Sequence, residues 1–192
     1  MAKPPLARER ILAAARQIVE RDGAGALTFD ELVKESGITR GGITYHFPTK
    51  EDLLRGLLEA DFRQWDDAEA ALTPTDCDPE TARLLGFIRT LTAQDESHRR
   101  FLCGMLSAAT LDPALMDPCR KDLRERLGRK QWTDRDLRLH LVHLAAEGLM
   151  WQELFQMYSM PGSARARLVA LMEELARKWG AGPAHRKIAK EA

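Results

Sequence analysis

Residues 39–47 bring together side chains and glycines that suit contact with a polyanion. The stretch holds one Arg, two Thr, one Tyr and one His, which can all hydrogen-bond phosphates or base edges. Gly41 and Gly42 each cost an α-helix roughly 1 kcal/mol relative to alanine, yet without a Cβ they let the backbone approach another surface closely. No Asp or Glu occurs in the 15 residues from Ser36 to Lys50. The pattern favours a short helix that approaches DNA.

A second group of residues could bind a metal ion. His140, His143 and Glu147 are spaced i, i+3 and i+7, which places them on one face of a helix. Three such ligands with an open position would suit an α-helical metal-dependent enzyme or a metal sensor. Histidines in so apolar a segment more often make hydrogen bonds in a core or an interface. We therefore expect no metal and no other cofactor, and keep the metal site as the alternative.

Nucleophilic catalysis has little support in this sequence. It contains no Gly-x-Ser-x-Gly motif and no Gly-rich phosphate loop after a strand. The three cysteines, Cys77, Cys103 and Cys119, form no Cys-x-x-Cys pair, so neither a zinc knuckle nor a disulfide framework is indicated. We expect a protein that is not an enzyme.

The overall charge limits how this chain could bind nucleic acid. Its 29 basic and 29 acidic residues give a formal net charge of zero, which excludes a histone-like polycation. DNA contact would have to come from a few well-placed cations. The chain has neither a secretory signal nor a run approaching the roughly 18–20 apolar residues of a membrane span. These features predict a cytoplasmic protein with no membrane partner.

Helical spacing of apolar residues recurs along the chain, whereas strand alternation and hairpin turns are missing. We expect an all-α protein of about nine helices. The expected helices span about 5–21, 29–36, 39–47, 50–72, 79–94, 97–110, 113–128 with a break near Pro118, 133–158 and 163–179. The expected domains are a DNA-binding domain at 1–50, a ligand-binding and dimerisation domain at 51–182, and a flexible tail at 183–192.

The helices expected at 29–36 and 39–47 have helix-turn-helix spacing. Thr28 and Glu31 form a potential capping box at the first of them. Gly37 suits the turn between the helices, and Thr39 can cap the second, which in a helix-turn-helix lies in the major groove of DNA. On spacing alone, an ordinary pair of packed helices remains the alternative.

The stretch from Ser36 to Leu54 resembles the signature of the TetR family of bacterial transcriptional regulators. The specific part is the run His46-Phe47-Pro48-x-Lys50-x-x-Leu53 after a glycine turn, and Leu27-Thr28-Phe29-Asp30-Glu31-Leu32 fits the same pattern. The resemblance covers about residues 8–58, while the rest of the chain agrees in the number and length of its helices. It implies a homodimeric repressor that binds a palindromic operator in double-stranded DNA and is released by a small, largely apolar molecule.

The resemblance also implies roles for individual residues. Thr28 would contact a phosphate and Lys50 the DNA backbone. The family usually has an aromatic residue three positions before the Phe, where this chain has Thr44 followed by Tyr45. Gly42 stands where the family often has a residue with a side chain, so the resemblance implies that base readout would depend heavily on Arg40 and Thr44. The residues expected to contact DNA are Thr28, Thr39, Arg40, Gly41, Gly42, Thr44, Tyr45, His46 and Lys50.

The last two helices are the expected dimer interface. The helix at 133–158 has one apolar stripe with Leu137, Leu141, Leu144 and Ala145 and another with Val142, Ala146, Leu149 and Met150. A helix that is apolar nearly all round is buried nearly all round, which favours a second chain covering one side. Two such helices from each subunit would form a four-helix interface. The expected interface residues are Val142, Ala146, Leu149, Met150, Leu168, Leu171, Met172 and Leu175.

A pocket for an unidentified small-molecule effector is expected between helices of the second domain. Aromatic and methionine side chains would form an apolar wall with few polar anchors. Such stripes are more often plain core, so this is the least specific of the expected sites. The candidate lining residues are Phe87, His98, Phe101, Met105, His143, Glu147, Trp151 and Phe155.

Overall fold

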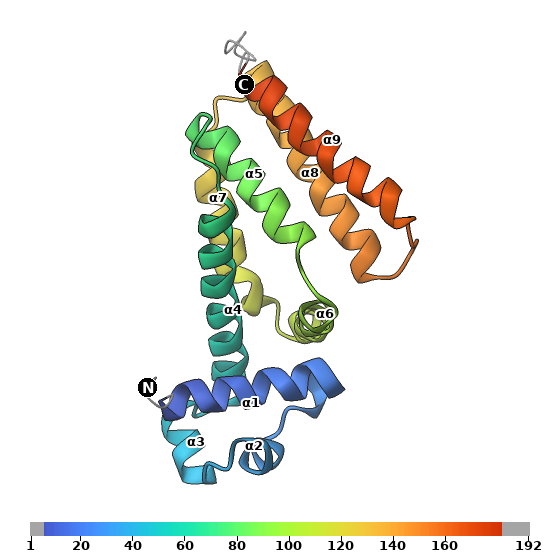
Figure 1. The fold of residues 1–192 in the computed structure, drawn as a ribbon. Helices are drawn as coiled ribbons and strands as arrows, with labels where there is room; N and C mark the ends of the chain where they lie inside the picture. Colours follow the sequence, from blue (N-terminus) through green and yellow to red (C-terminus); the bar gives the residue numbers. More distant parts are fainter. Residues whose placement is uncertain (1–5, 182–192) are drawn as a thin grey trace, which may run out of the picture. The chain divides into compact units, whose positions relative to one another are not determined.

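The computed structural model describes residues 6–181, and all regular secondary structure in this range is helical (Figure 1). The nine α-helices within it confirm the all-α expectation. They are α1 (Ala7–Asp22), α2 (Phe29–Ser36), α3 (Arg40–His46), α4 (Lys50–Leu72), α5 (Pro79–Thr92), α6 (Glu96–Leu111), α7 (Asp117–Gly128), α8 (Asp134–Leu154) and α9 (Gly162–Gly180). None of them combines the length and the apolar composition needed to cross a membrane.

The chain folds into two compact units that are not continuous in sequence. Within the described residues, the first contains residues 6–64 together with Asp95–Lys121, and the second contains Trp65–Gln94 and residues 122–181. Helix α6 therefore belongs to the unit that holds α1–α3. The boundary expected at residue 50 separates a DNA-binding from a ligand-binding domain by their functions, whereas these units are defined by packing. The expected boundary therefore stays a prediction. The tail expected at 183–192 lies outside the described residues.

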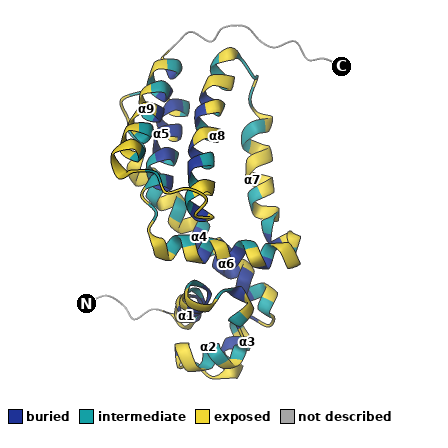
Figure 2. Ribbon diagram, turned by 90° about the vertical axis from the view of Figure 1, so that its right-hand side faces the viewer, coloured by how far each residue is buried: buried dark blue, intermediate teal, exposed yellow. Residues whose placement is uncertain are grey.

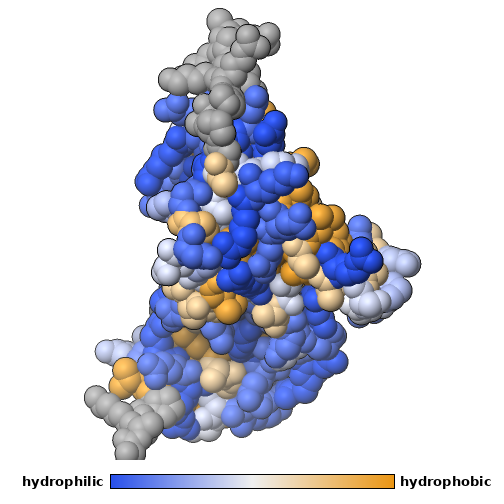
Figure 3. Space-filling model, turned by 45° about the horizontal axis from the view of Figure 1, so that its top comes forward, coloured by the Kyte–Doolittle hydropathy of each residue, from blue (hydrophilic) through white to orange (hydrophobic). Residues whose placement is uncertain are grey.

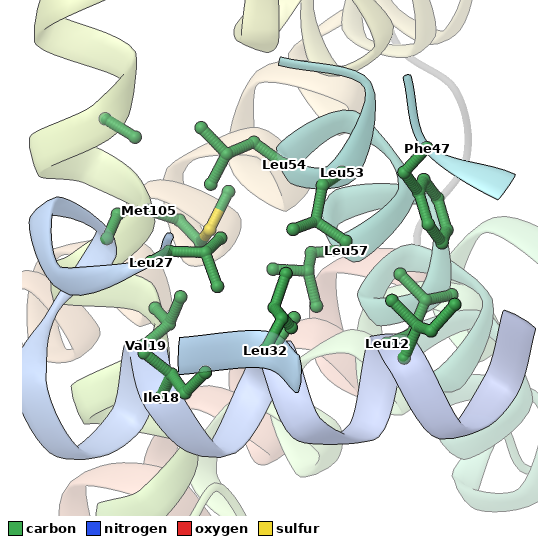
Figure 4. Packing of buried hydrophobic residues seen from close by; sticks show 14 of the residues in the cluster. Leu12, Ile18, Val19, Leu27, Leu32, Phe47, Leu53, Leu54, Leu57 and Met105 are labelled. Atoms are coloured by element: carbon green, nitrogen blue, oxygen red, sulfur yellow. The ribbon is translucent and has the colours of Figure 1, made fainter. Parts of the chain in front are cut away.

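The first unit has a continuous apolar core formed by α1, α2, α3, α6 and the first part of α4. Ile11, Ile18 and Phe101 are fully buried. Figure 4 shows side chains from α1, α2, α4 and α6 pointing toward one another, among them Leu12 and Leu32. Because the helix-turn-helix shares this core with the three longer helices α1, α4 and α6, α3 has a rigid base despite its seven residues.

The second unit is built on α5, α8 and α9. Its core contains Leu85, Ile88, Ala146 and Ala176, all at or near zero exposure. Figure 2 shows buried residues along one side of α5 and α8, while α7 has no buried residue. Helix α8 thus buries one stripe and leaves the rest of its circumference less covered.

Two boundaries test the expected helix ends. A 3-10 turn at Pro113–Met116 precedes α7, so the break expected near Pro118 is confirmed. The expected end of α8 at Tyr158 is wrong, since α8 ends at Leu154. Gln156 has a φ of 51°, and the amide of Met157 donates to the carbonyl of Gln152 at 3.0 Å. This left-handed residue closes the helix as glycine commonly does.

Candidate nucleic-acid interface and C-terminal pocket

Side-chain caps and one glycine fix the helix-turn-helix. Thr28 Oγ1 accepts from the amide of Glu31 at 3.2 Å, and Thr39 Oγ1 accepts from the amide of Gly42 at 3.2 Å. Gly37, between the helices, has a φ of 66°, which glycine adopts readily. The expected capping box at α2 is only half formed, because the Glu31 carboxylate accepts from Lys34 Nζ at 2.6 Å instead.

Helix α3 is anchored on one side and open on the other. Ile43 is fully buried and Phe47 is 3% exposed, so both fix the helix to the core. Gly41 is exposed and Tyr45 is 83% exposed, and this pair at i, i+4 lies opposite the anchors. The Tyr45 hydroxyl has no hydrogen-bond partner within residues 6–181. The outer face of α3 thus combines a bare backbone position with a free phenol.

The neighbouring Thr44 is placed differently. Its hydroxyl donates to the carbonyls of Arg40 and Gly41, at 3.1 and 3.2 Å. A threonine hydroxyl has one proton, so in this conformation its side chain can only accept from an outside group. Helical residues one step apart point about 100° apart, and here the residue that projects outward is Tyr45.

The two glycines of α3 have different surroundings. A Cβ at Gly41 would meet nothing within 4 Å, whereas a Cβ at Gly42 would lie 2.9 Å from Cγ2 of Ile38. The expectation that both glycines bare the backbone therefore needs correction at Gly42. This glycine is required by close packing inside the turn.

Cations around α3 are held by other groups in the chain. Arg40 Nη1 lies 2.8 Å from Oδ1 of Asp30, and its guanidinium lies 5.5 Å from the ring centroid of Phe29. Residues 36–50 contain no carboxylate themselves, but the fold brings the carboxylate of Asp30 next to Arg40. Lys50 Nζ donates to the carbonyl of Gly25 at 3.4 Å. His46 is partly exposed and meets the Tyr45 ring edge-on at 5.1 Å between centroids.

The second unit contains a pocket of about 640 Å³, called here the C-terminal pocket. It lies among the end of α4, α5, α7 and α8, and two of the expected residues, Phe87 and His143, line it. Their rings stack with centroids 4.2 Å apart. The remaining lining residues are Glu69, Pro79, Glu80, Arg83, Leu84, Leu123, Arg126, Leu127, Arg129, Lys130, Gln131, Thr133, Arg135, Asp136, Leu139 and His140.

The rest of the expected pocket set does not line this pocket. Phe101 and Met105 are buried in the core of the first unit, and His98 lies beside them on α6. Trp151 and Phe155 are exposed near the end of α8, with stacked rings 5.8 Å apart. Apolar spacing selected these residues, but it cannot tell a packed core or an outer surface from a cavity wall. The arginines of the pocket wall follow no apolar or helical pattern in the sequence, so no sequence signal marks them as lining residues.

The metal site considered as an alternative is not supported. His143 Nε2 lies 3.3 Å from Oε1 of Glu147, and the rings of His140 and His143 stack at 5.9 Å between centroids. The hydrogen bond from His143 lowers the pKa of Glu147. Within residues 6–181 no group of three His, Cys, Asp or Glu side chains is arranged to hold a metal ion. His143 and Glu147 thus form a hydrogen-bonded pair, and the ring of His140 stacks on that of His143.

The stripe of α8 that was expected at the dimer interface is mostly buried within the chain, and the other stripe is exposed. Val142, Ala146, Leu149 and, on α9, Met172 are at most 5% exposed in the chain's own core, so they are not available to a second chain. The other stripe is free, with Leu137 41%, Leu141 58% and Leu144 50% exposed. Of the other expected interface residues, Leu171 is 48% exposed, and Met150, Leu168 and Leu175 are partly exposed. Figure 3 shows apolar side chains gathered on the second unit beside the turn that joins α8 to α9.

Two protein-family models match this chain. Residues 11–57 match "Bacterial regulatory proteins, tetR family", and residues 81–177 match "Tetracyclin repressor-like, C-terminal domain". The HTH-type transcriptional regulator QacR of Staphylococcus aureus is 33% identical over 60 residues, which are 31% of this chain and 32% of QacR. The matched stretch thus spans about a third of that relative.

Solved structures match over nearly the whole chain. The multidrug binding protein EbrR complexed with imidazole has a TM-score of 0.61 at 22% identity, covering 94% of this chain and 98% of EbrR. A transcriptional regulator from Rhodococcus sp. Rha1 has a TM-score of 0.63 at 20% identity, covering 91% and 94%. At these identities the likeness shows the fold.

Proposed function

This chain belongs to the TetR family of bacterial regulatory proteins, and from that premise we propose that it is a DNA-binding transcriptional repressor. It binds a palindromic operator as a homodimer and releases it when a small molecule occupies the C-terminal pocket. Such a repressor acts in the cytoplasm, where the chromosome is accessible. Its action needs no cofactor and no catalytic step.

The outer face of α3 is the observation that carries this proposal. Gly41 offers open backbone and Tyr45 offers a free hydroxyl on the side opposite the buried anchors. A major groove about 12 Å wide admits such a helix, and a small residue at its centre brings the helix closer to the base edges. Arg40 at the start of α3 and Thr44 one turn later then lie near the bases.

Contacts to the DNA backbone come from the flanks of the same unit. The Thr28 hydroxyl accepts from the amide of Glu31, so its own proton remains available for a phosphate. Lys50, which begins α4, and Thr39 and His46 at the two ends of α3 supply further donors. We assign to Tyr45 the phosphate contact that an aromatic residue at the position of Thr44 would otherwise make. A few such contacts, doubled in a dimer, give salt-dependent binding without a large net charge.

The exposed stripe of α8 supports the homodimer. Leu137, Leu141 and Leu144 repeat at i, i+4 and i+7, and Gly148 continues the stripe with open space above its Cα. Leu171 on α9 adds apolar surface. Two helices from each chain would bury these side chains in a four-helix interface. The stripe replaces the buried one that the sequence suggested.

Operator selection followed by a binding assay tests the function. Full-length protein selects duplexes from a random-sequence library, and mobility shift measures affinity for the enriched sequence. We expect a palindrome, and Arg40→Ala should weaken binding by about 1–3 kcal/mol and relax its specificity. Arg63→Ala is the matched control, because Arg63 is an exposed arginine of the same unit on α4. If no sequence is enriched, or if both variants bind like wild type, the assignment is wrong.

A further inference from the structure

We infer that the C-terminal pocket binds an amphipathic anion, an aromatic or apolar body that carries one carboxylate. The inference rests on the proposed function only in taking this pocket as the effector site. Its volume of about 640 Å³ lies within the roughly 300–1,000 Å³ typical of small-molecule sites. The chemistry of the wall then decides which small molecules fit.

Basic side chains outnumber acidic ones around the pocket. Five arginine or lysine residues line it, against three carboxylates, an excess of two positive charges before any ligand binds. The cations are Arg83, Arg126, Arg129, Lys130 and Arg135, and the carboxylates are Glu69, Glu80 and Asp136.

The three carboxylates already have partners in the chain. Glu80 pairs with Lys130 and Arg135. Asp136 accepts from the amide and hydroxyl of Thr133, each at 2.8 Å, and Glu69 accepts from the indole of a tryptophan on α4 at 3.0 Å. Each carboxylate thus already accepts hydrogen bonds from donors of the chain itself.

Several of the cations are not neutralised in the same way. Arg83 on α5 and Arg129, which follows α7, form no ion pair and no hydrogen bond within residues 6–181. Arg126 Nη2 pairs with Asp122 at 2.7 Å, yet its Nε is buried and has no hydrogen-bond partner. Two unpaired guanidinium groups and one buried unused donor favour a ligand carboxylate, since charge-assisted hydrogen bonds are the strong ones.

The rest of the wall suits an aromatic or apolar body. Leu84 and Leu139 are at most 8% exposed, and Phe87 stacks on His143. Burial lowers the pKa of His140, which favours the uncharged form of this ring, and the ring adds a flat polarisable surface to the wall. A cation in this pocket would face the unpaired arginines, whereas a neutral analogue would leave their donors unused.

Three matched probes separate these possibilities. Naphthalene-2-carboxylate, naphthalene-2-carboxamide and naphthalen-2-ylmethylamine share one ring system and differ in charge. We expect titration calorimetry on the full chain to show the carboxylate binding at least tenfold more tightly than either analogue. Equal affinities, a preference for the amine, or no binding of the carboxylate at millimolar concentration would overturn the inference.

Two substitutions test whether the ligand carboxylate binds at Arg83 and Arg129. We expect Arg83→Gln and Arg129→Gln each to lower the affinity for the carboxylate probe by at least tenfold. The affinity for the carboxamide should stay unchanged. Arg124→Gln is the matched control, since Arg124 is an exposed arginine on α7 that does not line the pocket. An equally large loss of carboxylate affinity in Arg124→Gln would show that the anion is attracted by surface charge in general, and this would overturn the proposed site. None of these measurements uses DNA, so failed operator selection and failed anion binding are distinguishable.

Discussion

Arg40 Nη1 lies 2.8 Å from Oδ1 of Asp30, which joins the first residue of α3 to the first turn of α2. Both side chains are well exposed, at 63% and 78%. An exposed ion pair of this kind contributes at most about 1 kcal/mol, so DNA can displace the carboxylate. If Arg40 contacts the operator as proposed, Asp30 holds the guanidinium in place before binding and competes with the DNA for it.

Removing this competitor should tighten DNA binding. Asp30→Asn leaves the size of the side chain unchanged and removes a negative charge near the phosphates. We expect a few-fold gain in affinity for both operator and random duplex at low salt, corresponding to up to about 1 kcal/mol. Mobility shift at several salt concentrations measures this. Glu35→Gln is the control, because Glu35 lies on the same helix but pairs with Arg21. Its DNA affinity should rise less than that of Asp30→Asn. An equal rise would mean that the effect comes from net charge alone.

The two glycines of α3 should respond in opposite ways to alanine. Gly41→Ala fills open space and improves helix propensity, so the free energy of unfolding should rise by up to about 1 kcal/mol while operator affinity falls. Gly42→Ala brings a methyl against Ile38 and should lower stability. Thermal melts and mobility shift on both variants check this. A Gly41→Ala protein with full operator affinity would contradict close approach of the backbone at that residue.

Tyr45 and Thr44 can be separated by removing one oxygen from each. Tyr45→Phe deletes an exposed hydroxyl with no internal partner, so operator affinity should fall by about 0.5–1.5 kcal/mol without loss of stability. Thr44→Val deletes a hydroxyl that donates to the α3 backbone, and should change affinity less if Tyr45 makes the phosphate contact. The reverse order would return that contact to Thr44.

The exposed stripe of α8 gives a test of dimerisation. Leu141→Glu places a charge at the centre of the stripe, and burying it at an interface would cost several kcal/mol. Sedimentation should show a monomer at concentrations where wild type is a dimer. Leu111→Glu makes the same change at an 88% exposed leucine of the first unit, and should leave the oligomeric state unaltered. A dimeric Leu141→Glu protein would place the interface elsewhere.

A largely buried histidine in the first unit, His98, links stability to pH. His98 Nδ1 lies 3.1 Å from Arg16 Nη2 and 3.5 Å from Oδ1 of Asp61, and its Nε2 is buried without a partner. Burial lowers the pKa of His98, and the positive charge of Arg16 lowers it further. The carboxylates of Asp61, Asp95 and Glu20 act in the opposite direction but do not reverse the shift.

The sign of this effect follows from proton binding. Below the unfolded pKa of about 6.5 the unfolded chain takes up a proton that the folded chain resists, so stability is lost as pH falls from there toward the folded pKa. One such group contributes at most about 1.4 kcal/mol per pH unit. Urea unfolding at pH 7.5 and 5.5 should show a smaller drop for His98→Gln than for wild type. Equal drops in His98→Gln and wild type would contradict the role of His98.

Local sequence determines much of this fold. The caps at Thr28 and Thr39, the turn at Gly37 and the helix stop at Pro48 act within a few residues, so their effects can be predicted without a partner. The apolar spacing that predicted nine helices is equally local. The helix-turn-helix and its family resemblance depend on the same short-range features.

Tertiary packing decided what those features leave open. Both apolar stripes of α8 satisfy helical periodicity, and only contact with α5 and α9 determines that Val142 is buried and Leu141 is free. The pair of Asp30 with Arg40 likewise depends on how α2 packs against α3. The C-terminal pocket is lined by Arg83 and Arg129, which come from segments far apart in sequence. Helical periodicity fixes which residues share a face, but the free energy of burial depends on which other surface covers that face.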